Sequence, residues 1–504
     1  MKKREDLFHL IQAMSKSEKR YFTLDAKKSS TKGSKYLALF QEINDMELYD
    51  EAKLKKKFGK NLRYDKSYLY EAIMRSMRDY RSANSYAARI KEMILDAKYL
   101  HERGLYEQCG ERLNEAKGLA MDLDDQLSLL EINMADRELL RQIKSKEYAE
   151  IMERLIGEKE EILGEIHEEL KYFDLSDKLI LEVNRRFELR NEEEIEAFHT
   201  KYPTSIFEKI PRKLSGRSAL RYLQSSALYF QLLRDSDRVL DLYSQVVQWW
   251  DENKKIREEE FHKYIIDVSN LLHAVSSKEF YNEIPLIIRK LEKDPPKNHH
   301  DQGMVFQKTA IYKLVYYINS GQSEGIDKVV EEVQVGLDKY QIKAGSRNAL
   351  IFNTSVMLFM QEKFQQCADW NNRIIKGNKY ITRRDIRNGV MLLNLVAVFE
   401  LGDIEQFEGF FRKVTRYFYK KGMIEPNHFE KKIFNSFRDI YNSPPSELTN
   451  EYKKLEAYLT NLREDKDIKI SLGLDELLLL WVSSKLRNKT IINQLREKHA
   501  GQPT

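Results

Sequence analysis

The sequence predicts an all-α protein. Its 504 residues include only nine prolines, and none lies between Met1 and Tyr202, so long stretches can stay helical without a break. Leu, Glu, Lys, Ala and Arg are abundant, and these residues lose little entropy in a helix. A hydrophobic fraction of 42% beside 33% charged residues is typical of a folded chain with much solvated surface. The length allows about three globular domains or one repeat array, and the composition favours the array.

A pattern of two helices and a turn recurs through the middle of the chain. The clearest copy alternates small and large residues around a turn glycine and an aromatic: Ala97, Leu100, Gly104, Tyr106, Cys109, Leu113 and Ala116. This order resembles the tetratricopeptide repeat, a pair of antiparallel helices packed through small residues. Further copies span residues 227–246, 271–295, 314–333, 355–374 and 395–414, and weaker ones lie near 146–148 and 190–195.

The turns of these copies are evenly spaced. They fall at Gly104, Lys146, Arg190, Arg234, Lys278, Gly321, Glu362 and Gly402, about 40 to 44 residues apart, where the family's usual period is about 34. The resemblance covers roughly residues 90–430 and implies a right-handed α-solenoid of about eight antiparallel helix pairs. The alternative is an irregular helical bundle whose turns are evenly spaced by chance.

The chain is expected to divide into three parts. Residues 1–85 would form a basic N-terminal helical subdomain, 86–440 the repeat array, and 441–504 two or three capping helices beyond Pro444 and Pro445. The last part carries an apolar stripe, which we interpret as a docking face for the array rather than a membrane anchor: Leu474, Leu477, Leu478, Trp481 and Leu486.

The N-terminal part does not follow the repeat. A capping box at Ser15 and Glu18 predicts the start of a helix. The other expected helices cover 6–14, 49–59 and 65–81, together with one more between the capped helix and residue 49. A short helix ended by Gly59 and followed by a longer basic helix has the layout of a helix-turn-helix.

Basic residues of that longer helix are candidates for nucleic-acid phosphate contacts. They are Lys66, Arg75, Arg78 and Arg81. The alternative is that they form an ordinary solvated helix face, since no base-reading pattern accompanies them.

No residue pattern specifies a reaction. The sequence contains no phosphate-binding glycine loop, no GxSxG, no HExxH and no CxxC pair. His299, His300 and Asp301 have metal-ligand side chains, but we interpret them as a solvated loop, because no companion ligands follow at helical spacing. We therefore expect no catalytic residues, no cofactor, no metal site and no enzymatic activity.

In tetratricopeptide arrays the first helix of each pair lines the inner surface of the superhelix. Carried onto this chain, the resemblance makes apolar inner-face residues candidates for partner binding: Ile311, Val315, Phe352, Val356, Phe359, Leu392, Val396 and Phe399. Two interpretations stay open. Either a tight superhelix or the C-terminal helices bury these side chains, or they line a groove that accepts a partner helix or peptide.

The sequence favours a cytoplasmic protein. Glu5 and Asp6 interrupt the start of the chain before any apolar run develops, no stretch is long enough to span a bilayer, and Cys109 and Cys367 fit reduced packing residues. The leading hypothesis is a non-enzymatic scaffold that binds a protein or peptide. The alternative is a nucleic-acid-associated regulator that uses the basic N-terminal helices, with the array as a sensor or partner-binding module.

Overall fold

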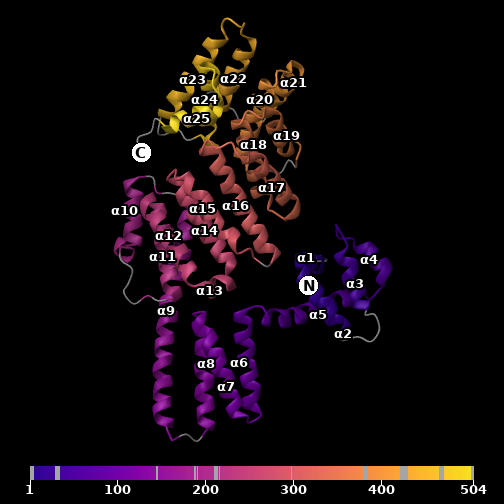
Figure 1. Cartoon of the computed structure of the whole chain (residues 1–504), viewed down its shortest axis with the longest axis vertical. Helices are drawn as coiled ribbons and strands as arrows, with labels where there is room; N and C mark the ends of the chain where they lie inside the picture. Colours follow the sequence, from indigo (N-terminus) through magenta and orange to yellow (C-terminus); the bar gives the residue numbers. More distant parts are fainter. Residues whose placement is uncertain are drawn as a thin grey trace. The chain divides into compact units, whose positions relative to one another are not determined.

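Helices make up all of the regular secondary structure in the described part of the chain. The computed structural model describes residues 5–28, 35–143, 146–186, 189, 191–208, 214, 216–296, 298–377, 383–420, 429–464 and 470–500. Over these ranges the chain forms twenty-five α-helices, three short 3-10 helices and no strand (Figure 1). The predicted all-α class is confirmed. Within the same ranges, no helix combines the length and the apolarity needed to cross a bilayer.

The chain separates into two compact units. Unit 1 comprises Met1–Lys278 and Pro295–Gln302, and unit 2 comprises Glu279–Asp294 and Gly303–Thr504. The boundary falls inside the predicted repeat array, and residues 441–504 share a unit with the array's second part. The predicted division at residues 85 and 440 stays a prediction.

The N-terminal part of unit 1 contains five helices with a core of their own. They are α1 (Asp6–Ala13), α2 (Lys16–Lys28), α3 (Lys35–Asn44), α4 (Glu51–Phe58) and α5 (Leu62–Ser82). The predicted capping box is present: Ser15 Oγ accepts from the Glu18 amide at 3.2 Å, and Glu18 Oε2 accepts from the Ser15 amide at 2.7 Å. Fully buried aliphatic side chains from α1, α3 and α5 pack together in this core: Leu7, Ile11, Leu39, Ile43, Leu69 and Ile73.

The rest of unit 1 is a row of helices, most of which pack against their neighbours in sequence. Their bounds are α6 (Tyr86–Glu102), α7 (Tyr106–Asp122), α8 (Gln126–Gln142), α9 (Tyr148–Arg186), α10 (Glu192–Lys201), α11 (Gly216–Leu232), α12 (Ser236–Glu252), α13 (Lys254–Glu259) and α14 (Phe261–Ser277).

Most of the predicted turns adopt left-handed backbone conformations. Gly104, Arg234, Gly321, Glu362 and Gly402 all have positive φ. At three of these turns, the amide of the next residue donates to the carbonyl five residues earlier, which would otherwise lack a partner at the helix end. These hydrogen bonds run from Leu105 to Leu100, from Asp235 to Phe230 and from Lys363 to Leu358, and each is 3.0 Å long. A turn of the same kind at Asp124, between α7 and α8, was not predicted.

The two weaker repeat copies are linked by one helix. Helix α9 runs unbroken for 39 residues, where two separate pairs would need a break between the second helix of one and the first helix of the next. The segment has no proline to interrupt it. The predicted turn at Arg190 lies outside the described residues, and Lys146 lies in the turn before α9.

Unit 2 is built on one continuous hydrophobic core that extends from Ala310 to Leu495. Its helices are α15 (Ile284–Lys293), α16 (His299–Asn319, which starts in unit 1), α17 (Ile326–Lys339), α18 (Ala344–Met360), α19 (Phe364–Ile375), α20 (Arg384–Glu400), α21 (Ile404–Lys420), α22 (Phe429–Asn442), α23 (Leu448–Glu464), α24 (Leu474–Arg487) and α25 (Ile491–Ala500). Helices α23, α24 and α25 form the predicted C-terminal segment.

Candidate functional site

The apolar inner-face residues predicted to bind a partner lie on α16, α18 and α20. Phe359 and Val396 are completely buried, and none of Phe352, Val356 and Leu392 is more than 8% exposed. The remaining three, Ile311, Val315 and Phe399, are half-buried. Most of this face is therefore core and presents little surface to a partner.

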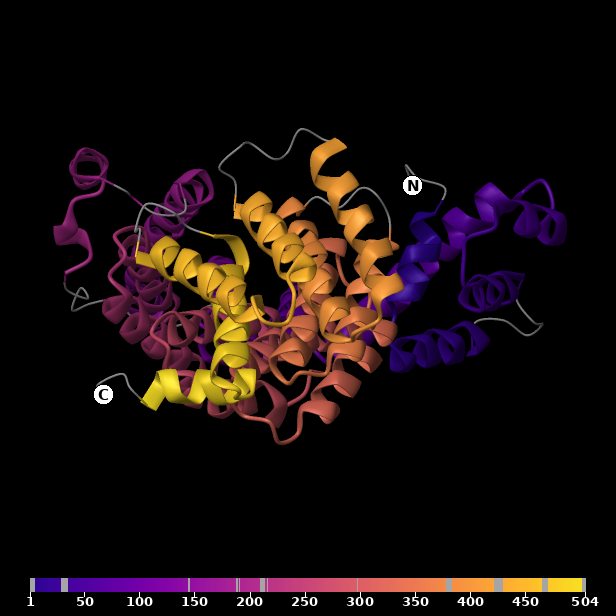
Figure 2. The same cartoon turned by 90° about the horizontal axis from the view of Figure 1, so that it is seen from above.

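The C-terminal helices cover this face. Trp481 of α24 stacks on Phe437 with ring centroids 5.2 Å apart and meets the edge of Phe399 at 6.4 Å. Its indole Nε1 donates to Glu400 Oε1 of α20 at 2.8 Å. In both whole-chain views the yellow C-terminal helices lie against the orange helices of the same unit (Figures 1 and 2). The five most buried residues of this face are thus core side chains, and Phe352 and Val356 lie beside residues of α24.

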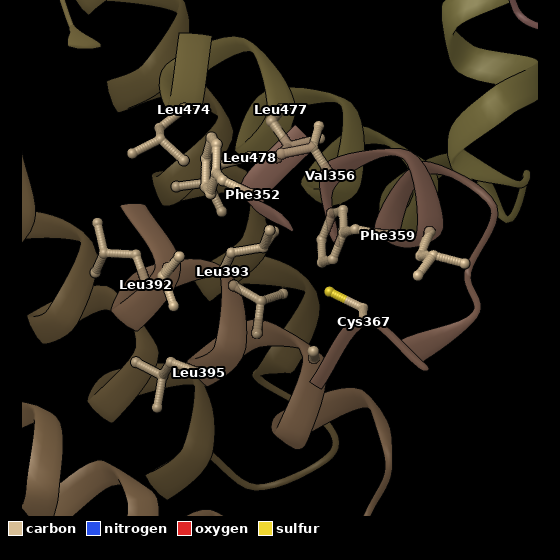
Figure 3. Close-up of a cluster of buried hydrophobic side chains, with 14 of the residues drawn as sticks. Phe352, Val356, Phe359, Cys367, Leu392, Leu393, Leu395, Leu474, Leu477 and Leu478 are labelled. Carbon is tan, nitrogen blue, oxygen red and sulfur yellow. The ribbon is translucent and has the colours of Figure 1, made fainter. Parts of the chain in front are cut away.

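The apolar stripe of α24 is the other side of the same contact. Leu474, Leu477, Leu478 and Trp481 are buried, and Leu486 is half-buried. The close-up shows the three leucines of α24 facing the cluster that contains Phe352 and Val356 (Figure 3). The prediction that this stripe is a docking face is confirmed.

The covering is incomplete, and a cavity remains between α16 and α18 on one side and the C-terminal helices on the other. Its volume is about 230 Å³. The residues that line it include three of the predicted partner-binding residues; the full lining is Val315, Ile318, Asn319, Phe352, Asn353, Val356, Met360, Leu472, Gly473, Glu476, Leu477, Leu480 and Leu495.

The polar side chains of the cavity are held by neighbours in unit 2. Asn319 Nδ2 donates to the Val315 carbonyl at 2.7 Å, and Asn353 Nδ2 donates to the Ala349 carbonyl at 2.8 Å. Glu476 forms an ion pair with Lys498. The walls are otherwise aliphatic or aromatic, so the cavity favours an apolar group and offers amide groups for hydrogen bonds beside it.

One side of the cavity depends on residues that the sequence did not single out. Leu472 and Gly473 precede α24, and both adopt left-handed conformations, with φ of 66° and 62°. Leu472 is 37% exposed and packs toward Gly389 of α20. If Gly389 carried a Cβ atom, that atom would lie 3.2 Å from both Leu472 and Phe352. Gly389 thus allows the close approach of this segment to α20. No local sequence signal pairs residues 389 and 472, because the contact is long-range.

The basic N-terminal candidates separate into two kinds. Lys66 is 5% exposed; its Nζ lies 3.0 Å from Glu51 Oε2 and 4.9 Å from the centroid of the Tyr49 ring. It is a buried partner of α4 and is not presented to a phosphate. Arg75, Arg78 and Arg81 are exposed on α5.

The predicted loop at His299, His300 and Asp301 is instead the first turn of α16. Asn298 accepts from the Asp301 amide at 2.7 Å and donates to its carboxylate at 2.7 Å, which caps the helix start. The expectation of a loop was wrong, because the Asn298 cap compensates for the nearby prolines.

Comparisons with known proteins assign no family. No protein family model, no curated protein and no solved structure matches this chain.

Proposed function

We propose that this chain is a non-enzymatic interaction scaffold of the cytoplasm, whose tetratricopeptide-like array binds a protein segment through the unit 2 cavity. The observation that carries the proposal is the cavity itself, because Val315, Phe352 and Val356 of the inner face line it together with residues of α24 and α25. The cytoplasmic location is supported by Cys109 and Cys367, two free thiols whose pKa values are raised by burial.

The size of the cavity indicates what it binds. Sites for whole small-molecule ligands measure about 300 to 1,000 Å³, and this cavity is smaller, at about 230 Å³. It matches one large apolar side chain, such as Leu, Met or Phe, better than a cofactor. Asn319 and Asn353 would then meet the backbone of the segment that carries this side chain. The proposed ligand is a peptide with a single apolar anchor.

A selection from a random peptide display library against the full chain tests this proposal. The matched variants are Val315→Trp, which fills the cavity, and Val335→Trp, which adds the same bulk at a 56% exposed site on α17. Selected peptides should share one large apolar residue, bind wild type and Val335→Trp equally, and lose affinity for Val315→Trp by about tenfold or more. Peptides that bind Val315→Trp as tightly as wild type would show that the cavity is not the site.

A second candidate function, contact with nucleic acid, is supported by one observation. Arg75, Arg78 and Arg81 are exposed at three-residue spacing along α5. If they contact phosphates, duplex DNA should bind with a steep salt dependence, and replacing all three by Ala should reduce the slope by about three counterions. Unchanged affinity and slope in the triple variant would remove this candidate.

A further inference from the structure

Helix α9 is covered differently along its two halves. The N-terminal half packs against α8 and the C-terminal half against α11 (Figure 1). Leu155 is buried on the α8 side, where Asn133 of α8 donates to its carbonyl at 2.9 Å. Tyr172 and Leu179 are buried further along, and Ser225 of α11 donates to the Tyr172 carbonyl at 3.0 Å. In a repeat array, each helix pair packs against the next pair along its length. On α9, the following long helix, α11, packs against the second half.

A partly exposed face of α9 carries a heptad pattern. Residues spaced alternately by four and three form a line that we call the α9 seam: Met152, Ile156, Lys159, Leu163, Ile166, Leu170 and Phe173. Ile156, Leu163, Leu170 and Phe173 are between 40% and 55% exposed, although each is a large apolar residue. Spacing of this kind keeps one stripe facing a partner helix, with Lys159 as a polar interruption that can fix register. The seam covers 22 residues, about 33 Å of helix.

Such a seam is unlike ordinary exposed hydrophobic residues. Single apolar side chains on a surface are normal, whereas a contiguous line of them marks an interaction site. The period of 3.5 residues selects a helix as the partner, because a strand or an extended peptide has no matching repeat.

The charges beside the seam indicate the partner's chemistry. Along one edge, Glu153, Glu160, His167 and Asp174 are all exposed. Between Tyr148 and Leu170 the helix holds eight glutamates against one arginine and one lysine. If two copies of α9 paired through the seam, the acidic edge of one would face acidic or uncharged residues of the other. No positive charge would balance it, which disfavours self-association. A helix with a basic edge would be complementary.

We propose that the α9 seam docks a helix of another protein, one that carries apolar residues at heptad spacing and Lys or Arg along the edge that faces Glu153, Glu160 and Asp174. This surface lies in unit 1 and does not depend on the cavity of unit 2.

Two designed 22-residue helical peptides test the proposal with the full-length protein. Both carry Leu at the seam-facing positions; one has Lys at the flanking positions and the other has Glu. Calorimetric titration should show that the Lys peptide binds one chain, more weakly as salt is added, and that the Glu peptide does not bind.

Leu163→Glu is the informative variant, because it removes an apolar contact and adds a negative charge. If the Lys peptide binds by nonspecific charge attraction, its affinity for this variant should rise. If it docks on the seam, its affinity should fall by about tenfold or more. Leu170→Glu should act in the same way. Leu95→Glu, at a 66% exposed site on α6, is the control and should bind as wild type does.

Three results would overturn the proposal: no binding of the Lys peptide to the folded protein, equal binding of the Lys and Glu peptides, or unchanged affinity in both seam variants. Sedimentation equilibrium adds a fourth, a wild-type dimer that Leu163→Glu dissociates, because the occupant would then be a second copy. Val315→Trp should leave Lys-peptide binding intact, so failure here is distinguishable from failure of the cavity proposal.

Discussion

Trp481 is the best single position for testing how the C-terminal helices stabilise unit 2. Its ring is completely buried, stacked on Phe437 and in edge contact with Phe399 and Tyr452, and its Nε1 donates to Glu400. Truncation to Ala leaves a cavity and removes the hydrogen bond, and it should cost about 3 to 5 kcal/mol. This loss is a large part of a typical domain's stability of about 5 to 15 kcal/mol.

The conservative variant retains most of the ring packing and removes the hydrogen bond. Trp481→Phe keeps an aromatic ring on Phe437 and removes the donor to Glu400, which retains Lys485 at 2.5 Å. Loss of one hydrogen bond to this carboxylate should cost about 1.5 kcal/mol. The free energy of unfolding should therefore fall in the order wild type, Trp481→Phe, Trp481→Ala.

Hydrogen exchange read by mass spectrometry measures where the stability is lost. In Trp481→Ala the amides of α18 and α20 should exchange about a hundredfold faster or more, because opening of the C-terminal helices exposes the inner face. Amides of α12 in unit 1 are the internal control and should exchange as in wild type. If exchange accelerates in α24 while α18 and α20 keep their protection, the C-terminal helices do not stabilise the inner face.

Two further predictions concern buried charges in unit 1. Asp267 accepts hydrogen bonds from Trp250 Nε1 and Gln224 Nε2, and its burial raises its pKa to about 6. Between about pH 4 and pH 6 the folded state therefore keeps a proton that the unfolded state releases. As pH rises through this range, the group should lower the free energy of unfolding by up to about 3 kcal/mol. Asp267→Asn should lack this fall in urea titrations at pH 4.5 and 7.5, and an identical pH dependence would contradict the assignment. Lys66→Met should lower the melting temperature, because it leaves Glu51 without its 3.0 Å partner, whereas unchanged melting would show that the ion pair contributes nothing.

Features that depend on neighbouring residues could be predicted from the sequence. The Ser15 and Glu18 capping box is encoded by two residues three apart, and its two hydrogen bonds are present. The turn at Gly104 is encoded by a glycine between two periodic segments. The turn at Asp124 was missed because it lacks glycine; the Asp125 side chain, which accepts from the Ser128 amide at 3.1 Å as a helix cap, was the signal that could have located it.

Features that depend on long-range contacts could not be predicted. From the sequence, Phe359 and Val396 could belong to a groove or to the core, because their burial depends on packing among helices that are far apart in the sequence. Lys66 resembles a surface lysine of a basic helix, and only the position of Glu51 on the preceding helix shows that it is buried in an ion pair. The cavity depends on Leu472, whose contact with Gly389 joins residues far apart in the sequence.

The most direct test of the proposed peptide site is site-specific photocrosslinking at its rim. A photoreactive amino acid replaces Leu472, which lines the cavity and is 37% exposed, and in a control protein it replaces Val335. On irradiation with a selected peptide, we expect a crosslink from position 472 that Val315→Trp abolishes, and none from position 335. A peptide that binds the chain but crosslinks equally from both positions, or crosslinks from position 472 despite Val315→Trp, would show that it does not bind in the cavity.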